Sequence, residues 1–304
     1  MSLEFQTRLL VSVLIAVAMA VVFVLLVAGG LLLARQVPAL WRRLRRRPPP
    51  FAEDTLREAG HGYRRRLTRL NERLLLAWAT FAVLAAGSAA VWQLLPSPLP
   101  SVFRPWAVAL IAAAVTAVLA GAGYLLFLWL RERHVVVHAY RASRAVGHAL
   151  QRLALEGHRV FHSVPCENYV LDHVVVGPKG VFVVNVVPYR KRRRDKGPGE
   201  VRIAERQIDF DGRRFIPPVL DATRKARCLA NRLSQVVRHP VAVKSAIIAP
   251  GWEPKGNDAN EHLLLTTRTV TLLTRWTTPD AHLMREDAVL IHDFLTRSSL
   301  DTSV

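Results

Sequence analysis

The sequence predicts a membrane-spanning α-helical region followed by an α/β domain with a mixed central sheet. The chain has 304 residues, 51% of them apolar, and its first part contains three long stretches without a charged residue. Beyond residue 130, short runs of β-branched residues alternate with amphipathic stretches, the pattern of strands and helices packed in layers. Lysine and arginine number 42 against 23 aspartate and glutamate, a formal net charge of +19. The apolar content excludes an intrinsically disordered chain.

The uncharged stretches are residues 9–34, 74–95 and 106–130. About 20 apolar residues cross the hydrocarbon core of a bilayer, so each stretch is long enough for a transmembrane helix. Arginines are concentrated in the loop 35–73, which the positive-inside rule places in the cytoplasm. We therefore expect residues 1–130 to form a membrane anchor in a bacterial-type inner (plasma) membrane. In this multi-pass topology the N-terminus is outside and residues 131–304 form a cytoplasmic domain.

The elements expected in the cytoplasmic domain follow from periodicity and turn signals. Helical spacing of apolar residues predicts helices, and β-branched runs bounded by glycine, proline or aspartate predict strands. The expected helices are 135–156, 219–237, 270–276 and about 278–297, and the expected strands are 159–164, 169–176, 181–187, 201–203, 208–210, 241–249 and 262–266. This order indicates an α/β domain with a mixed sheet.

The stretch 171–184, LDHVVVGPKGVFVV, resembles the core hairpin of the NERD (nuclease-related) domain family. The resemblance covers about residues 139–250, with a helical extension to residue 304. It implies a restriction-endonuclease-like fold of the PD-(D/E)xK superfamily, whose carboxylates hold Mg²⁺ while a lysine orients water for phosphodiester hydrolysis. The metal-binding aspartate of that pattern corresponds to Asp172, which is present.

The other positions of the family pattern depart from it. The glutamate and lysine of E-x-K fall on Asn185 and Val187, the helix glutamate falls near Ala142 and Ser143, and the glutamine of the later helix falls on Lys225. An amide oxygen lacks the formal charge that binds a hard divalent cation, and valine cannot position water. We therefore expect a catalytically silent relative without a cofactor, with Asp172 as the vestige of the metal site.

An active nuclease with a rearranged site is the alternative. In that case Lys225 replaces the strand lysine, one of Glu167, Asp209 and Asp221 supplies a second carboxylate, and Mg²⁺ is the cofactor.

The basic residues point to an anionic partner. Residues 131–304 contain 28 lysines and arginines against 18 acidic residues, and the densest run lies in 190–196. The expected contact residues are Arg190, Lys191, Arg192, Arg193, Arg194, Lys196, Arg224 and Arg227. Sequence-independent binding to nucleic-acid phosphates and contact with anionic lipid both fit such a surface. The candidate functions are a nucleic-acid- or partner-binding module, the rearranged nuclease, and a membrane assembly or scaffold protein.

The cysteines and a histidine pair are two further residue types with possible chemical roles. Cys166 and Cys228 are expected to be reduced, as in other cytoplasmic domains. His134 and His138 have the i, i+4 spacing of some zinc ligands, but no accompanying acidic motif, and are expected to lie at a membrane interface.

Overall fold

The computed structural model describes residues 56–94, 105–191, 199–204, 206–257, 261–276 and 283–300. Two compact units divide the chain. Of the described residues, the first unit contains 68–94 and 105–134, and the second contains 56–67 and 135–300. The helices α2 (His61–Leu94) and α3 (Pro105–Leu150) each contribute residues to both units.

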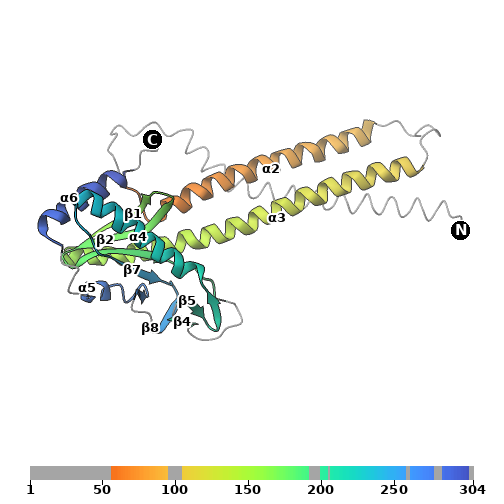
Figure 1. Cartoon of the computed structure of the whole chain (residues 1–304). Helices are drawn as coiled ribbons and strands as arrows, with labels where there is room; N and C mark the ends of the chain where they lie inside the picture. Colours follow the sequence, from red (N-terminus) through yellow and green to blue (C-terminus); the bar gives the residue numbers. More distant parts are fainter. Residues whose placement is uncertain are drawn as a thin grey trace. The chain divides into compact units, whose positions relative to one another are not determined.

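The first unit consists of parts of α2 and α3, which run side by side in Figure 1. Leu70, Leu74 and Phe81 are buried on α2, and Arg133 Nε of α3 donates a hydrogen bond of 2.9 Å to Asn71 Oδ1 of α2. A polar contact therefore joins the two helices, and α2 also has buried apolar residues.

The predicted transmembrane helices are not supported by this structure. Among the described residues, no helix is long and apolar enough to cross a membrane, which contradicts the spans at 74–95 and 106–130. The two stretches are parts of longer helices that also contain charged residues, among them Arg64–Arg66 on α2 and Arg131 and Arg133 on α3. The stretch 9–34 lies outside the described residues, and the predicted multi-pass inner-membrane location is likewise contradicted.

The second unit is an α/β domain with two sheets, so the predicted α/β class with mixed sheets fits. The strands are β1 (Arg159–Cys166), β2 (Tyr169–Gly177), β3 (Gly180–Val186), β4 (Gly199–Ala204), β5 (Gln207–Phe210), β6 (Arg213–Phe215), β7 (Val243–Ile248), β8 (Trp252–Asn257) and β9 (His262–Leu265). The helices are the last part of α3, the 3₁₀ turn η1 (Gln151–Glu156), α4 (Pro217–Val237), α5 (Leu272–Arg275) and α6 (Arg285–Ser298).

The main sheet has the strand order β1-β2-β3-β7-β9, in which β1, β2 and β3 are antiparallel and β3, β7 and β9 are parallel. One face packs on α4 and α6 through residues such as Leu229 and Ile291. The other packs on α3 and α5 through residues such as Val146 and Leu273. Because both faces are covered, β2 and β3 consist of nearly continuous apolar runs.

The small sheet has the order β6-β5-β4-β8. Its inner face carries Val201, Ile203, Ile208 and Phe210, which form an apolar cluster with the start of α4. Figure 1 shows β4, β5 and β8 at one end of the domain, apart from the β1–β2 hairpin. The β3–β4 connection, which contains the basic run, therefore links the two sheets.

Candidate functional site

The β2–β3 hairpin places Asp172 and Asn185 side by side. His173 lies opposite Val184 in the antiparallel register, so Asp172 and Asn185 form the next pair along the two strands. Asp172 Oδ2 accepts a hydrogen bond of 3.3 Å from the backbone N–H of Val186. The alternation of the strands turns both side chains toward the face of the sheet that α4 covers.

Helix α4 brings Lys225 to this pair. Lys225 Nζ lies 3.3 Å from Asp172 Oδ2, and the two side chains are only 19% and 12% exposed. Leu229 and Leu233, one and two turns further along α4, are buried in the main core and hold the helix on the sheet. The Asp172 carboxylate is thus paired with an ammonium group in a partly desolvated position.

Asn185 is buried beside the ion pair. Its Nδ2 donates a hydrogen bond of 3.5 Å to Ser245 Oγ of β7, whereas its Oδ1 has no hydrogen-bond partner among the described residues. Val187 follows β3 and packs with the apolar cluster beneath the small sheet. The structure therefore joins Asp172, Asn185 and Lys225, and gives Val187 a packing role.

Tyr63 of α2 lies within electrostatic reach of Asp172, although nothing in the sequence indicated it. Burial raises the pKa of its phenol well above the usual value, and the negative charge of Asp172 raises this pKa further, whereas Arg66 lowers it. Tyr63 is therefore protonated and lies within electrostatic reach of Asp172. Tyr63 lies 109 positions before Asp172 in the sequence, so only the tertiary structure could reveal that the two are close enough to interact electrostatically.

Residues 138–250 match the family model of NERD, the nuclease-related domain. This match agrees with the resemblance found in 171–184 and with the expected core of about 139–250. Neither the curated proteins nor the solved structures contain a match to this chain.

The metal that the nuclease-related fold implies does not fit the residues present. A divalent cation needs several charged oxygen ligands, but Asp172 is paired with Lys225 and its neighbour Asn185 is uncharged. Within the described ranges, no group of three or more histidine, cysteine, aspartate or glutamate side chains could hold a metal ion. The site is chemically a carboxylate–ammonium pair with an amide beside it.

The carboxylates considered as replacements lie elsewhere in the NERD region. Glu167 occupies the turn between β1 and β2 with φ +49°, and Asp221 is exposed on α4. Asp209 lies in β5, between Arg202 and Arg214. In the described part of the chain, none of the three forms an ion pair with Lys225.

Two histidines lie behind the site, on the α3 face of the sheet. His162 Nδ1 and His173 Nδ1 are 2.8 Å apart, so one ring donates a hydrogen bond to the other. Burial lowers the pKa of His162, and burial together with the neighbouring His162 lowers that of His173 further. Both rings are consequently neutral at pH 7, and Ser143, near the predicted family glutamate, is buried on the same side.

The predicted contact residues are only partly described. Arg190 is exposed directly after Tyr189, and Arg224 and Arg227 are exposed on α4. Lys191 is half-buried, whereas Arg192, Arg193, Arg194 and Lys196 lie outside the described residues.

An aromatic cluster fixes the start of the basic run. The Tyr189 ring stacks on Phe210 at a centroid distance of 4.5 Å, and Trp252 Nε1 donates a hydrogen bond of 2.8 Å to the Tyr189 carbonyl oxygen. The ring of Trp252 also lies against Gly199, where a Cβ would approach within 2.6 Å. Tyr189 and Gly199, the two residues that flank the segment 190–198, thus both contact the indole of Trp252.

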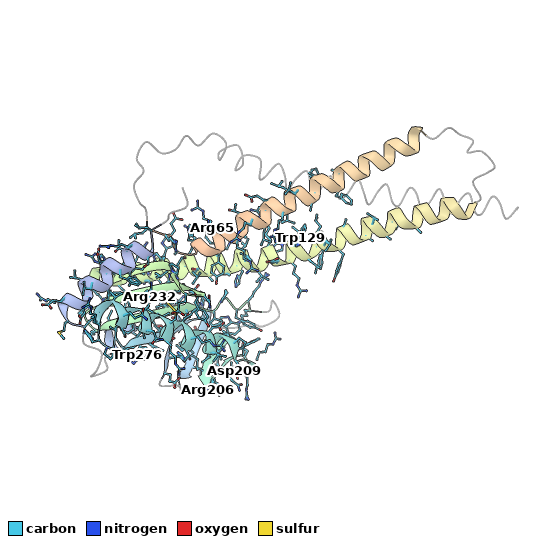
Figure 2. All side chains as sticks on the ribbon, turned by 45° about the horizontal axis from the view of Figure 1, so that its top comes forward. Arg65, Trp129, Arg206, Asp209, Arg232 and Trp276 are labelled. Atoms are coloured by element: carbon cyan, nitrogen blue, oxygen red, sulfur yellow. A yellow bond between two sulfur atoms is a disulfide. The ribbon has the colours of Figure 1, made fainter. Side chains whose placement is uncertain are left out.

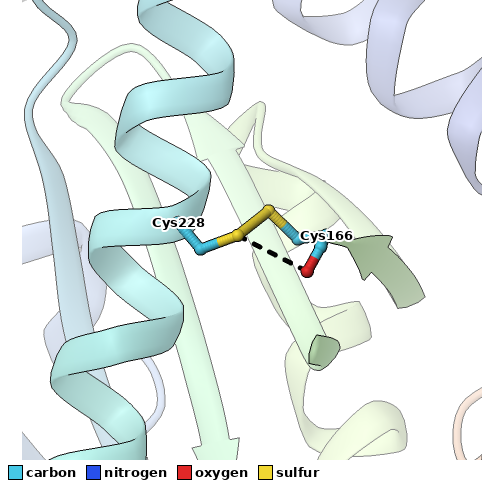
Figure 3. Close-up of a disulfide and its surroundings, with 2 residues drawn as sticks. All are labelled: Cys166 and Cys228. Atoms are coloured by element: carbon cyan, nitrogen blue, oxygen red, sulfur yellow. Dashed lines mark hydrogen bonds between the residues drawn. A yellow bond between two sulfur atoms is a disulfide. The ribbon is translucent and has the colours of Figure 1, made fainter. Parts of the chain in front are cut away.

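The two cysteines form a disulfide, contrary to the expectation that they are reduced (Figure 3). Cys166 ends β1 and Cys228 lies on α4, with a Cα–Cα distance of 6.5 Å. The Cys228 sulfur also lies 3.4 Å from the Cys166 carbonyl oxygen, the contact dashed in Figure 3. The expectation was wrong because it rested on the cellular location, whereas the packing of α4 against β1 brings these distant residues together.

Proposed function

We propose that residues 138–250 act as a catalytically silent nucleic-acid-binding domain of the nuclease-related type. The observation that carries this proposal is the ion pair of Lys225 Nζ with Asp172 Oδ2 at 3.3 Å. For a divalent cation to bind Asp172, the carboxylate would have to give up this partner in a partly desolvated position. Asn185 would then offer the cation an uncharged oxygen in place of a second carboxylate.

The binding part of the proposal rests on charge. Residues 131–304 contain 28 basic and 18 acidic residues, and Arg190, Arg224 and Arg227 are exposed. Lysine and arginine side chains that neutralise phosphates release condensed counterions, which makes the affinity depend on salt, and phosphate contacts are independent of the base sequence. A surface of this kind suits the phosphate backbone of nucleic acid.

Binding can be tested with the full-length protein and a short labelled DNA duplex by fluorescence anisotropy over a series of salt concentrations. We expect binding at low salt that weakens linearly in the logarithm of salt concentration. Absence of binding at low salt would refute the proposal.

One observation favours the rearranged nuclease as a second candidate, because Lys225 approaches Asp172 as a catalytic lysine of the superfamily would. The same duplex should be incubated with the protein and Mg²⁺ or Mn²⁺. Metal-dependent cleavage that is lost in both Asp172→Ala and Lys225→Ala would establish the enzyme and overturn the silent assignment. Cleavage that persists in both variants would indicate a contaminating nuclease.

A further inference from the structure

The outer face of the small sheet carries an arginine pair built around a buried carboxylate. Arg202 of β4 and Arg214 of β6 both lie opposite Asp209 of the central strand β5. Arg202 Nη2 is 3.6 Å and Arg214 Nε is 3.8 Å from the same atom, Asp209 Oδ2. The Asp209 side chain is 8% exposed, whereas the arginine side chains are 52% and 67% exposed. The arginines therefore cover the aspartate and face solvent themselves.

This arrangement leaves donors available to a second anion. The ion-pair distances of 3.6 and 3.8 Å exceed those of hydrogen bonds, and a guanidinium group carries five N–H donors. In the described part of the chain, neither guanidinium group makes another ion pair. Since two positive charges converge on one negative charge, the cluster retains one positive charge in excess.

The acidic side chains near the cluster have partners of their own. Glu200, on the same face of β4, pairs with Lys255 Nζ of β8 at 2.8 Å. Asp211, in the turn after β5, accepts a hydrogen bond of 2.8 Å from the backbone N–H of Glu200. Glu200 is therefore neutralised by Lys255, whereas Asp211 accepts from a neutral backbone N–H and, among the described residues, forms no ion pair with Arg202 or Arg214.

The cluster lies next to the start of the basic run. Arg213, which precedes Arg214 in β6, donates a hydrogen bond of 3.3 Å to Tyr189 Oη, and Arg190 follows Tyr189. Arg206, in the turn between β4 and β5, is exposed, and Figure 2 shows it near Asp209. Besides Arg202 and Arg214, the exposed residues Arg190, Arg206 and Arg213 therefore add positive charge to this part of the domain.

We infer that Arg202 and Arg214, held by Asp209, form a clamp for a phosphodiester of the nucleic-acid backbone. Two converging guanidinium groups can bind the two free oxygens of one phosphate with charge-assisted hydrogen bonds. Asp209 is the positioning residue, because it overcomes the repulsion between the two arginines before the ligand arrives. This inference rests on the proposed nucleic-acid binding and assigns part of it to the small sheet, where sequence analysis expected α4 and the 190–196 run.

The test compares the full-length Arg202→Gln/Arg214→Gln variant with wild type in the salt-dependent duplex-binding assay. We expect about tenfold weaker binding and a slope of log affinity against log salt that is shallower by about 1. Arg202→Lys/Arg214→Lys keeps both charges and should keep most of the slope. Arg297→Gln, a charge loss on α6 away from the small sheet, should leave the slope unchanged. Urea unfolding of each variant checks that the fold is intact.

The possible failures are distinguishable. If wild type binds the duplex and the double glutamine variant binds with the same affinity and slope, the clamp is refuted while the proposed function stands. If wild type does not bind at low salt, both are refuted. If the double variant loses binding to vesicles of anionic lipid but keeps duplex binding, the clamp serves a different ligand and the inference is overturned.

Discussion

Lys225 is the residue on which the interpretation of the site depends most directly. Its loss leaves the Asp172 carboxylate in a position where the side chain is only 12% exposed, and among the described residues the backbone N–H of Val186 is its remaining hydrogen-bond donor. We expect Lys225→Ala to lower the free energy of unfolding by about 2 to 3 kcal/mol, measured by urea denaturation.

Lys255 provides a matched control for that substitution. It pairs with Glu200 at 2.8 Å, but the two side chains are 69% and 55% exposed. Lys255→Ala should therefore change the free energy of unfolding by no more than about 0.5 kcal/mol. If Lys225→Ala and Lys255→Ala lowered the free energy of unfolding equally, the Lys225–Asp172 pair would be as well solvated as a surface ion pair.

Asn185 offers a gain-of-function test of the missing metal site. Asn185→Glu combined with Lys225→Gln places a second carboxylate beside Asp172 and removes the competing ammonium group. We expect Mn²⁺ to bind this variant at least about tenfold more tightly than wild type, which corresponds to about 1.4 kcal/mol. Isothermal titration calorimetry measures the affinity, and unchanged Mn²⁺ binding would show that the site lacks room for a cation.

His162 and His173 should make the stability of the domain depend on pH. Their pKa values in the folded state are lowered by burial, whereas an unfolded histidine has a pKa of about 6.5. Below about pH 6.5 these histidines bind protons in the unfolded chain but not in the folded domain. Their contribution to the free energy of unfolding is therefore fully present above this pH and is lost as the pH decreases. Each histidine contributes up to about 1.4 kcal/mol per pH unit in that window.

The measurement is urea unfolding of wild type and His162→Asn on both sides of pH 6.5. Asparagine can keep a hydrogen bond to His173 without titrating, so the variant should lose less stability at acidic pH. An identical pH dependence in the two proteins would exclude His162 as its source.

At the scale of elements, the sequence predicted the hairpin of β2 and β3 well and the small sheet poorly. The valine runs on both sides of Gly177–Gly180 can only be strands buried on two faces, and the amphipathic pattern of 219–237 agrees with α4. The strand β8 was missed because Trp252–Asn257 contains Pro254 and Gly256 and shows no alternation. Its pairing with β4 depends on a distant partner, which periodicity cannot reveal.

The residues of the candidate site were predictable only in part from the sequence. Asp172 and Asn185 share a hairpin, so local register and the family resemblance place them together. Lys225 was identified through the resemblance alone, and its ion pair with Asp172 required the structure. Tyr63 and the Cys166–Cys228 pair come from elements far apart in the chain, and neither carries a local signal.

The disulfide is the element-scale contact with the largest expected effect, because it joins β1 to α4 across 62 residues. Closing a loop of this length restricts the unfolded chain, and we expect Cys166→Ser/Cys228→Ser to lower the free energy of unfolding by about 2 to 4 kcal/mol. Urea denaturation with and without a thiol reductant measures the effect. Reductant should destabilise wild type and leave the double serine variant unchanged; insensitivity of wild type would indicate that the thiols are not joined in solution.

At the scale of the whole molecule, the family match and the long apolar stretches lie mostly in different parts of the chain. The NERD match covers 138–250, which includes the main site, the basic run and the small sheet, while α6 lies beyond it and packs on α4. The apolar stretches that suggested a membrane region belong to α2 and α3 or lie outside the described residues. The length of the uncharged stretches predicted transmembrane helices wrongly. The valine-rich sequence predicted the β2–β3 hairpin correctly, because there the composition was combined with a defined turn.

The bond between Cys166 and Cys228 also closes the intervening polypeptide into a covalent ring that includes Asp172, Asn185, the arginine pair and Lys225. A single protease cut after the exposed Arg190 would therefore open the ring without releasing either piece. On a denaturing gel the severed chain should migrate as one species until a thiol is added, and as two afterwards. Immediate separation without a thiol would show that the ring is open.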